Sequence, residues 1–162
     1  MVMDRMEDIL RKELDALKDD LIRRHEELGM KASGAWQQSL QVSANGVAGL
    51  LKGAVSGLDY TYYMQHGRKG GKMPPIAAIE AWIKSKGVIA IERRVKVGAL
   101  AWAIAKKIAK DGTKRSREGE MPAFIEEVIT PERVQDIIHK VGYGYVSTFV
   151  SEIINFLKDI KE

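Results

Sequence analysis

The chain has 162 residues, no cysteine, and 26 basic against 22 acidic side chains, which gives a formal charge of +4. This length fits one domain of about 100–200 residues. A hydrophobic share of 45% with 30% charged residues is typical of globular rather than disordered chains. The absence of cysteine excludes disulfides, thiolate metal sites and thiol nucleophiles. There is no run of 18 apolar residues, and the charged first residues are unlike a signal peptide, so we expect a soluble protein made in a cytoplasm.

The charge is distributed unevenly along the chain. Residues 93–117 hold nine basic side chains and one acid, whereas residues 118–137 hold six acids and one basic side chain. A basic block beside an acidic block suits either nucleic-acid binding or pairing with another copy of the chain. The alternative is a solvated helix face followed by a flexible loop.

Residues 3–28 have the pattern of one long helix. Leucines and a methionine recur at intervals of seven and four, which makes a narrow apolar stripe, and Gly29 is a natural stop. Such a stripe fits a helix that lies on a sheet or against another helix. Its length exceeds the needs of one small domain, so part of it could pack against a neighbouring subunit.

Residues 35–64 change to the alternating period of strands. We expect a first strand over 36–43, a hairpin turn at Asn45-Gly46, a second strand over 47–55, a turn at Ser56-Gly57 and a tyrosine-rich third strand over 58–64. Together they would form an antiparallel meander.

Two central helices follow a loop at 66–75. The first is expected over 76–86, where it buries Ile76, Ile79, Trp82 and Ile83, with Gly87 at its end. Residues 88–91 are a short apolar run, either a strand or a tight connection. The second helix is expected over 97–110, with one apolar face and lysines in its last turn, where they suit the helix dipole.

The C-terminal part begins with a charged stretch, 112–121, that we expect to be a mobile loop, and with 123–129 as a strand or extended arm. Thr130-Pro131-Glu132 is a helix start, with a capping hydroxyl, a proline and an acid in the first turn. Gly142 and Gly144 are expected to interrupt or kink this helix, and a broad apolar face continues to the end. The fold class is therefore α+β: a small antiparallel meander packed with a long N-terminal helix, two central helices and a C-terminal helix, in one domain over 1–162.

Reactive groups do not converge in the sequence. His25, His66 and His139 are far apart, without the spacing of metal ligands, and His25 and His139 are expected on the surface of helices. The loop at 67–73 has one residue too few and Met73 in place of a hydroxyl, so it is not a nucleotide-binding loop. We therefore expect no enzyme, and no catalytic, cofactor or metal site. The alternative function is sequence-nonspecific nucleic-acid binding by the basic 93–117 segment.

The order of elements and a set of short motifs resemble the tail-completion, or head–tail joining, neck proteins of tailed bacteriophages. The motifs are an aromatic segment ending in Gly-Arg, a basic Gly/Pro loop, a helix with a Trp-Ile pair and a Lys-Gly ending, and an alanine-rich helix ending in Gly-Thr. The residues that carry them are Tyr60, Tyr63, Met64, Gly67 and Arg68; Gly71, Lys72, Pro74 and Pro75; Trp82, Ile83, Lys86 and Gly87; and Leu100, Ala101, Ala103, Ile104, Ala105, Lys107, Ile108, Gly112 and Thr113. The similarity covers residues 35–115, and the two ends agree in element order alone.

The resemblance implies a structural virion protein with no cofactor. It would form an oligomeric ring in the phage neck that joins the capsid portal to the tail and surrounds the DNA channel. Its partners would be its own copies, portal or adaptor proteins, and tail or other neck proteins, with nonspecific contact to packaged DNA as a further possibility and no membrane. The protein would be assembled in the host cytoplasm and reside in the virion.

Two groups of residues are candidates for contacts between subunits. The first is a basic, adaptable loop that would reach a neighbouring subunit or ring: Gly67, Arg68, Lys69, Lys72, Pro74 and Pro75. The second is a charged group that would line the lumen or pair with the acidic 118–127 stretch of the next copy: Lys114, Arg115, Arg117, Glu118 and Glu120. The alternative for the first group is a plain exposed connector.

Overall fold

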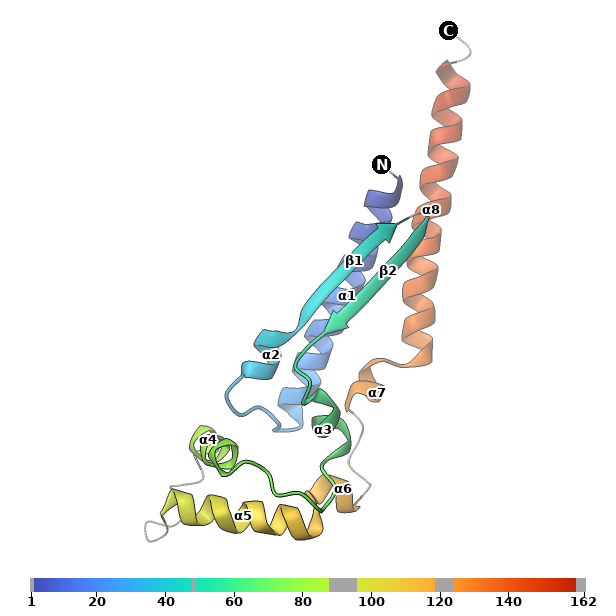
Figure 1. The fold of residues 1–162 in the computed structure, drawn as a ribbon. Helices are drawn as coiled ribbons and strands as arrows, with labels where there is room; N and C mark the ends of the chain where they lie inside the picture. The colour runs from blue at the N-terminus through green and yellow to red at the C-terminus, as the bar shows by residue number, and fades with distance from the viewer. Residues whose placement is uncertain (1, 48, 88–95, 119–123, 160–162) are drawn as a thin grey trace. The chain divides into compact units, whose positions relative to one another are not determined.

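The computed structural model describes residues 2–47, 49–87, 96–118 and 124–159, and it confirms the α+β class (Figure 1). Contacts divide the chain into two compact units. Unit 1 comprises Met1–Arg24, Leu40–Ser56 and Ile125–Glu162, and unit 2 comprises His25–Ser39 and Gly57–Phe124. Each unit is described in turn. That the whole chain acts as one domain stays a prediction.

Unit 1 is built around helix α1 (Val2–Glu27), which confirms the expected N-terminal helix. The helix contacts two partners through two of its faces. One face, with Leu10 and Leu14, lies against a β-hairpin, and another, with Ile9, lies against the C-terminal helix α8 (Pro131–Asp159). Leu14, Leu17 and Leu21 of the predicted stripe are buried. The apolar stripe of α1 therefore packs against both the β-hairpin and helix α8.

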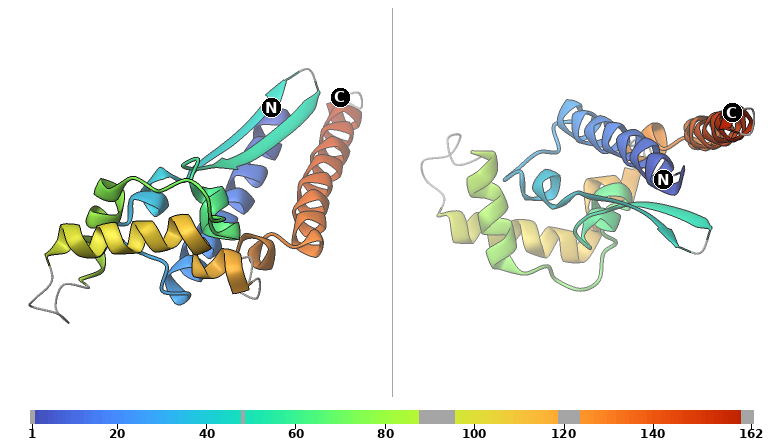
Figure 2. Two further views of the ribbon diagram at one scale, coloured as in Figure 1. Left: turned by 60° about the horizontal axis from the view of Figure 1, so that its bottom comes forward. Right: turned by 90° about the horizontal axis from the view of Figure 1, so that it is seen from above.

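The hairpin consists of β1 (Gln41–Val47) and β2 (Leu50–Ser56), and it runs alongside α1 (Figure 2). The predicted turn at Asn45-Gly46 is wrong: Asn45 pairs with Lys52 inside the ladder, and the last pair of the ladder is Val47 with Leu50. Packing explains this register, because small residues must face α1. A Cβ on Gly46 would lie 2.7 Å from the Met3 side chain, and one on Gly53 would lie 2.7 Å from Leu14.

Helix α8 is continuous through Gly142 and Gly144, so the expected interruption is wrong. A Cβ on Gly144 would lie 2.5 Å from the Ile9 side chain, whereas one on Gly142 would meet nothing within 4 Å. Gly144 therefore allows α8 to approach α1 closely, and both glycines keep helical hydrogen bonding. The predicted helix start is confirmed, since the Arg133 amide donates to the Thr130 hydroxyl at 3.2 Å.

Unit 2 contains the short helices α2 (Ala35–Ser39), α3 (Thr61–His66) and α6 (Lys114–Glu118) and the two central helices α4 (Ile76–Lys86) and α5 (Val97–Asp111). The central helices confirm the prediction, and Gly87 ends α4 in the left-handed conformation. They pack on each other through Ile83, Ala101 and Ala105, which are fully buried.

Two residues of α4 differ from expectation. Ile76 is 37% and Trp82 is 43% exposed, although both were expected in the core. Residues 88–91, predicted as a strand or connection, lie outside the described residues.

An aromatic cluster forms a second core within unit 2. His25, near the end of α1, stacks on Trp36 with ring centroids 4.5 Å apart, and Phe124 meets both rings edge-on. All three are buried, so the expected surface position of His25 is wrong. The Trp36 indole also donates to the Thr61 hydroxyl at 3.0 Å. The apolar stripe of α1 therefore ends in an imidazole that packs as an aromatic side chain.

Several extended segments of the prediction are helical instead. The sheet has two strands, and the tyrosine segment expected as a third strand forms a turn followed by α3. The start of the predicted first strand is α2, and the predicted arm at 123–129 contains α7 (Phe124–Val128). The predicted loop at 112–121 contains α6. In each case local β-propensity or polarity is overridden by packing, as with Trp36 and Phe124 in the aromatic cluster.

No helix among the described residues combines the length and the hydropathy that are needed to cross a bilayer.

Candidate assembly surfaces

The backbone of the predicted 67–75 loop is hydrogen-bonded to Thr113, in the turn between α5 and α6, and to the last turn of α5. The Arg68 amide donates to the Thr113 hydroxyl at 2.9 Å, and the Thr113 amide donates back to the Arg68 carbonyl at 2.8 Å. A third bond joins the Gly71 amide to the Ala109 carbonyl at 2.6 Å. These contacts bring together two candidate groups that lie about 45 residues apart in sequence. The loop is therefore anchored by its backbone at both Arg68 and Gly71.

Two glycines make this close contact possible. Gly67 has φ +73° and ψ −178°, a combination that is essentially restricted to glycine. A Cβ on Gly67 would lie 2.5 Å from the Ser116 amide nitrogen, and one on Gly112, at φ +77°, would lie 2.8 Å from the Arg68 carbonyl oxygen. The close contact between the loop and the α5–α6 turn thus requires a glycine on each side, because a Cβ at either position would clash.

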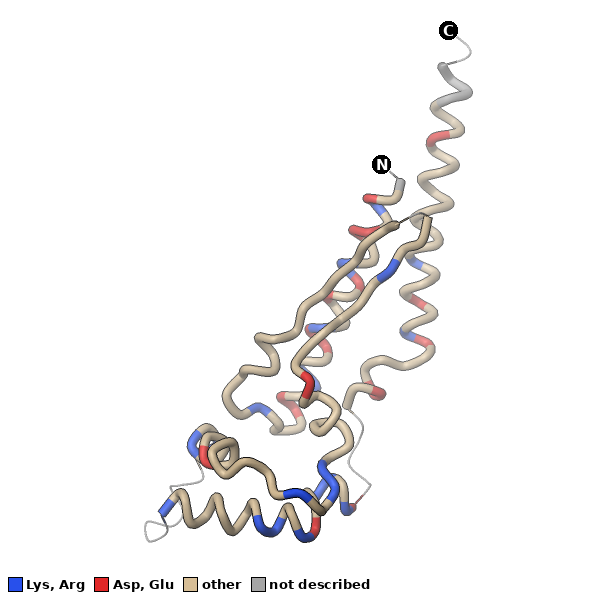
Figure 3. Tube along the Cα trace, viewed as in Figure 1, with Lys and Arg blue, Asp and Glu red and all other residues tan. Residues whose placement is uncertain are grey.

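The joined segments present a basic cluster, which we define as Arg68, Lys69, Lys72, Lys110, Lys114 and Arg117. In Figure 3 these basic segments gather where the loop meets the end of α5 and α6. One contact is internal to the cluster, since the Arg68 guanidinium donates to the Lys72 carbonyl at 2.9 Å, and one leaves it, since Lys114 lies 3.7 Å from Glu118. The lysines and Arg117 are exposed.

The other predicted residues of these groups have different positions. Pro74 is buried, and Pro75 is the N-cap residue of α4. The Arg115 side chain is half-buried and contacts the Gln65 carbonyl and the Met30 sulfur. Glu120 lies outside the described residues, as do Arg93 and Arg94 of the basic 93–117 segment. Arg115 thus faces the interior of unit 2 rather than the basic cluster.

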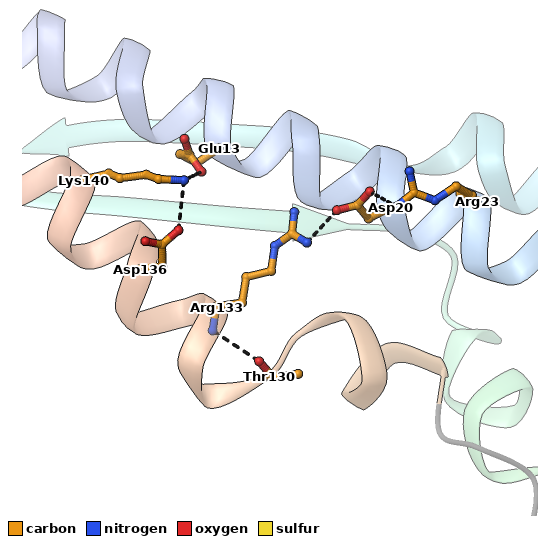
Figure 4. A network of polar contacts seen from close by, with 7 residues as sticks. All are labelled: Glu13, Asp20, Arg23, Thr130, Arg133, Asp136 and Lys140. Atoms are coloured by element: carbon orange, nitrogen blue, oxygen red, sulfur yellow. Dashed lines mark hydrogen bonds and ion pairs between the residues drawn. The ribbon is translucent and has the colours of Figure 1, made fainter.

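Within unit 1, one face of α8 is tied to α1 by ion pairs (Figure 4). Arg133 meets Asp20 at 2.6 Å, and Lys140 bridges Glu13 at 3.0 Å and Asp136 at 2.9 Å. The hydrogen bonds that the Lys140 ammonium donates to Asp136 and Glu13 raise its pKa, because both stabilise its charged form. These pairs are partly exposed, so solvent and salt screen their attraction.

The rest of α8 carries an apolar surface that the described residues leave open. Its members are about half exposed, and most recur at helical spacing on the side of α8 turned away from α1. We call this the α8 apolar face: Ile138, Tyr145, Val146, Phe149, Val150, Ile153 and Ile154. Gly144 and the ion pairs lie on the side of α8 that contacts α1, and no charged side chain is a member of the α8 apolar face. The sequence predicted a broad apolar face here, and the structure leaves it exposed.

The tip of the hairpin adds a smaller apolar site in unit 1. Val47 is 71% and Leu50 is 70% exposed, and the two residues are cross-strand partners. A soluble monomer rarely presents contiguous apolar surface of this kind unless another molecule covers it.

The described residues contain no group of three or more histidine or carboxylate side chains that could hold a metal ion. His66 and His139 are exposed, and His25 belongs to the aromatic cluster. Comparison of the chain with protein-family models, with curated proteins and with solved structures gave no match. The surfaces described above therefore carry the functional argument.

Proposed function

We propose that this protein is a structural subunit of the neck of a tailed bacteriophage, where copies form a ring that joins the capsid portal to the tail and surrounds the DNA channel. The resemblance in residues 35–115 suggests this class, and the α8 apolar face is the observation that carries the argument. The protein acts as a building block and not as an enzyme. Its residence in the virion and its portal, adaptor and tail partners are part of the same proposal.

The α8 apolar face suits a contact between subunits. It is long, uncharged and only half covered, and its aromatic members Tyr145 and Phe149 are of the type enriched in interface cores. In a ring, one surface of each copy meets a different surface of the next copy. We assign this face to the subunit contact and the basic cluster to docking on acidic surfaces, such as residues 118–127 of a neighbour.

Light scattering on the purified full chain tests the proposal. We expect a discrete oligomer that Phe149→Glu together with Ile153→Glu converts to monomer, because each charge would be buried in the contact. Ser151→Glu is the control, since it adds a carboxylate in the same turn at an exposed polar position outside the α8 apolar face. An antibody against the protein should label the neck of phage particles.

A chain that stays monomeric at all concentrations and labels no particle would contradict the proposal. The second candidate, a free nucleic-acid-binding protein, is favoured by the exposed lysines of α5 and the basic cluster. It predicts tight duplex binding by a monomer or dimer, with an affinity that falls steeply with salt.

A further inference from the structure

Unit 2 contains a half-open cavity of about 870 Å³, all of whose described lining residues belong to that unit. This volume lies within the range of small-molecule and peptide side-chain sites. Its walls are mainly apolar and aromatic, and they come from the end of α1, the segment that follows it, and helices α2, α3, α4 and α6. The largest wall residues are Leu28, Met30, Trp36, Tyr60, Met64 and Trp82.

The cavity is also positively charged. Lys86 and Arg115 both line it, and among its described lining residues none is acidic. Within the described residues, the contacts of these two cations are with neutral groups. The Lys86 ammonium donates to the Gly29 carbonyl at 2.6 Å, and the Arg115 guanidinium reaches the Gln65 carbonyl and the Met30 sulfur. Two cations that line an apolar cavity and have no carboxylate partner there favour the binding of an anion.

His25 supplies a third polar group at the same place. It lines the cavity and is only 2% exposed, and its Nε2 atom has no hydrogen-bond partner among the described residues. Its Nδ1 atom lies 3.4 Å from the Gln37 amide nitrogen, and the tautomer with the proton on Nε2 allows Nδ1 to accept from that amide. A buried donor without an acceptor is rare in a folded protein and marks a place where an acceptor is missing.

We propose that this cavity is a binding site for an apolar anion, that is, an aromatic or aliphatic body that carries one carboxylate. The body would lie against Trp36 and Trp82, and the carboxylate would pair with Lys86 and Arg115. Two sources offer this chemistry: a free amphiphile, or an acidic side chain beside an aromatic one in a segment of another protein. The proposal goes beyond the proposed ring and does not depend on it.

Titration calorimetry on the full chain tests the site with two probes. Decanoate represents the free amphiphile, and an acetylated Leu-Trp-Glu tripeptide represents the protein segment. We expect one of them to bind and Lys86→Glu to weaken that binding about tenfold or more, because the charge that meets the carboxylate is reversed. Lys84→Glu is the matched control on α4, since Lys84 is exposed and does not line the cavity.

A second pair of variants tests the volume rather than the charge. Ala81→Trp should weaken binding by occupying part of the cavity beside Trp82, while Ala77→Trp adds the same bulk on an exposed part of α4 outside the lining and should bind normally. Binding of decanoate alone identifies a free amphiphile, and binding of the peptide alone identifies a protein partner. If neither probe binds, or if Lys86→Glu and Ala81→Trp bind as well as their controls, the proposal is overturned.

Discussion

Gly67 lies at the close contact between the 67–75 loop and the α5–α6 turn. Its backbone angles exclude other residues, and a Cβ would meet the Ser116 amide nitrogen at 2.5 Å. We therefore expect Gly67→Ala to lower the free energy of unfolding by about 1–3 kcal/mol. Urea denaturation measures this. Lys69→Ala, two residues away and exposed, should change it by less than about 0.5 kcal/mol. Equal effects at the two positions would contradict the assignment.

His25 makes stability depend on pH. Burial, assisted by the nearby charges of Lys86, Arg115 and Lys31 and opposed by Glu26, lowers the pKa of His25 below 6.5. The unfolded chain then binds a proton at a pH where the folded chain does not. Stability should be constant above pH about 6.5 and fall as the pH drops below that value, by up to about 1.4 kcal/mol per unit.

Thermal unfolding between pH about 7.5 and 5.5 measures this dependence. His25→Gln should flatten the curve, because the amide does not titrate but keeps hydrogen-bonding capacity toward Gln37. His139→Gln removes an exposed histidine and should leave the slope unchanged. A native protein whose stability is flat over this range would rule out a buried neutral His25.

At the scale of elements, α8 combines a polar face held by α1 with an apolar face left open. Its two glycines test this asymmetry. Gly142→Ala should raise stability by about 0.5–1 kcal/mol, because the helix gains propensity and the methyl meets nothing. Gly144→Ala should give less or none of that gain, because Ile9 must move. Circular dichroism melts of both variants decide, and equal gains would mean that α8 does not lie against Ile9.

The elements that the sequence predicts correctly are helices whose apolar residues keep the helical spacing over several turns. α1, α4, α5 and α8 follow from their apolar spacing and caps, because these signals are local. The prediction of a third strand is wrong. Tyrosine-rich segments suit strands, but Thr61 here starts a helix, and its hydroxyl accepts a hydrogen bond from the Trp36 indole. The hairpin register was also wrong, since the packing of Gly46 and Gly53 under α1 outweighs the Asn-Gly turn signal.

At the scale of the whole molecule, the two proposed contact surfaces differ in chemistry and should respond to salt in opposite ways. Association through the α8 apolar face should persist or strengthen when salt rises from about 50 mM to about 500 mM, because burial of apolar surface is not screened. Contacts of the basic cluster with anionic groups, whether the carboxylates of a neighbour or the phosphates of DNA, should weaken over the same range. Light scattering and fluorescence anisotropy with a labelled duplex measure the two effects.

Charge variants separate these surfaces. Lys69→Glu with Lys72→Glu should lower DNA affinity, whereas Lys52→Glu, an exposed lysine on β2 in unit 1, should have a smaller effect. Oligomer mass and DNA affinity that fall together with salt would show that one surface serves both contacts.

The candidate residues could be found in the sequence, but their arrangement could not. Lysine and arginine clusters are visible by counting, whereas the bonds between Arg68 and Thr113 join segments that no local pattern connects. The cavity was missed for the same reason, because its walls come from distant segments and His25 was expected on the surface. A histidine that continues the apolar stripe of α1, four residues after Leu21, was the one available signal.

The division of the chain has a consequence for its synthesis. The last segment of unit 2 ends at Phe124, while unit 1 still requires residues from Ile125 onward. On the ribosome, which releases the chain from its N-terminal end, unit 2 can therefore be completed before unit 1. Helix α8 leaves the exit tunnel after the whole of unit 2, so nascent chains cannot associate through the α8 apolar face before unit 2 has emerged.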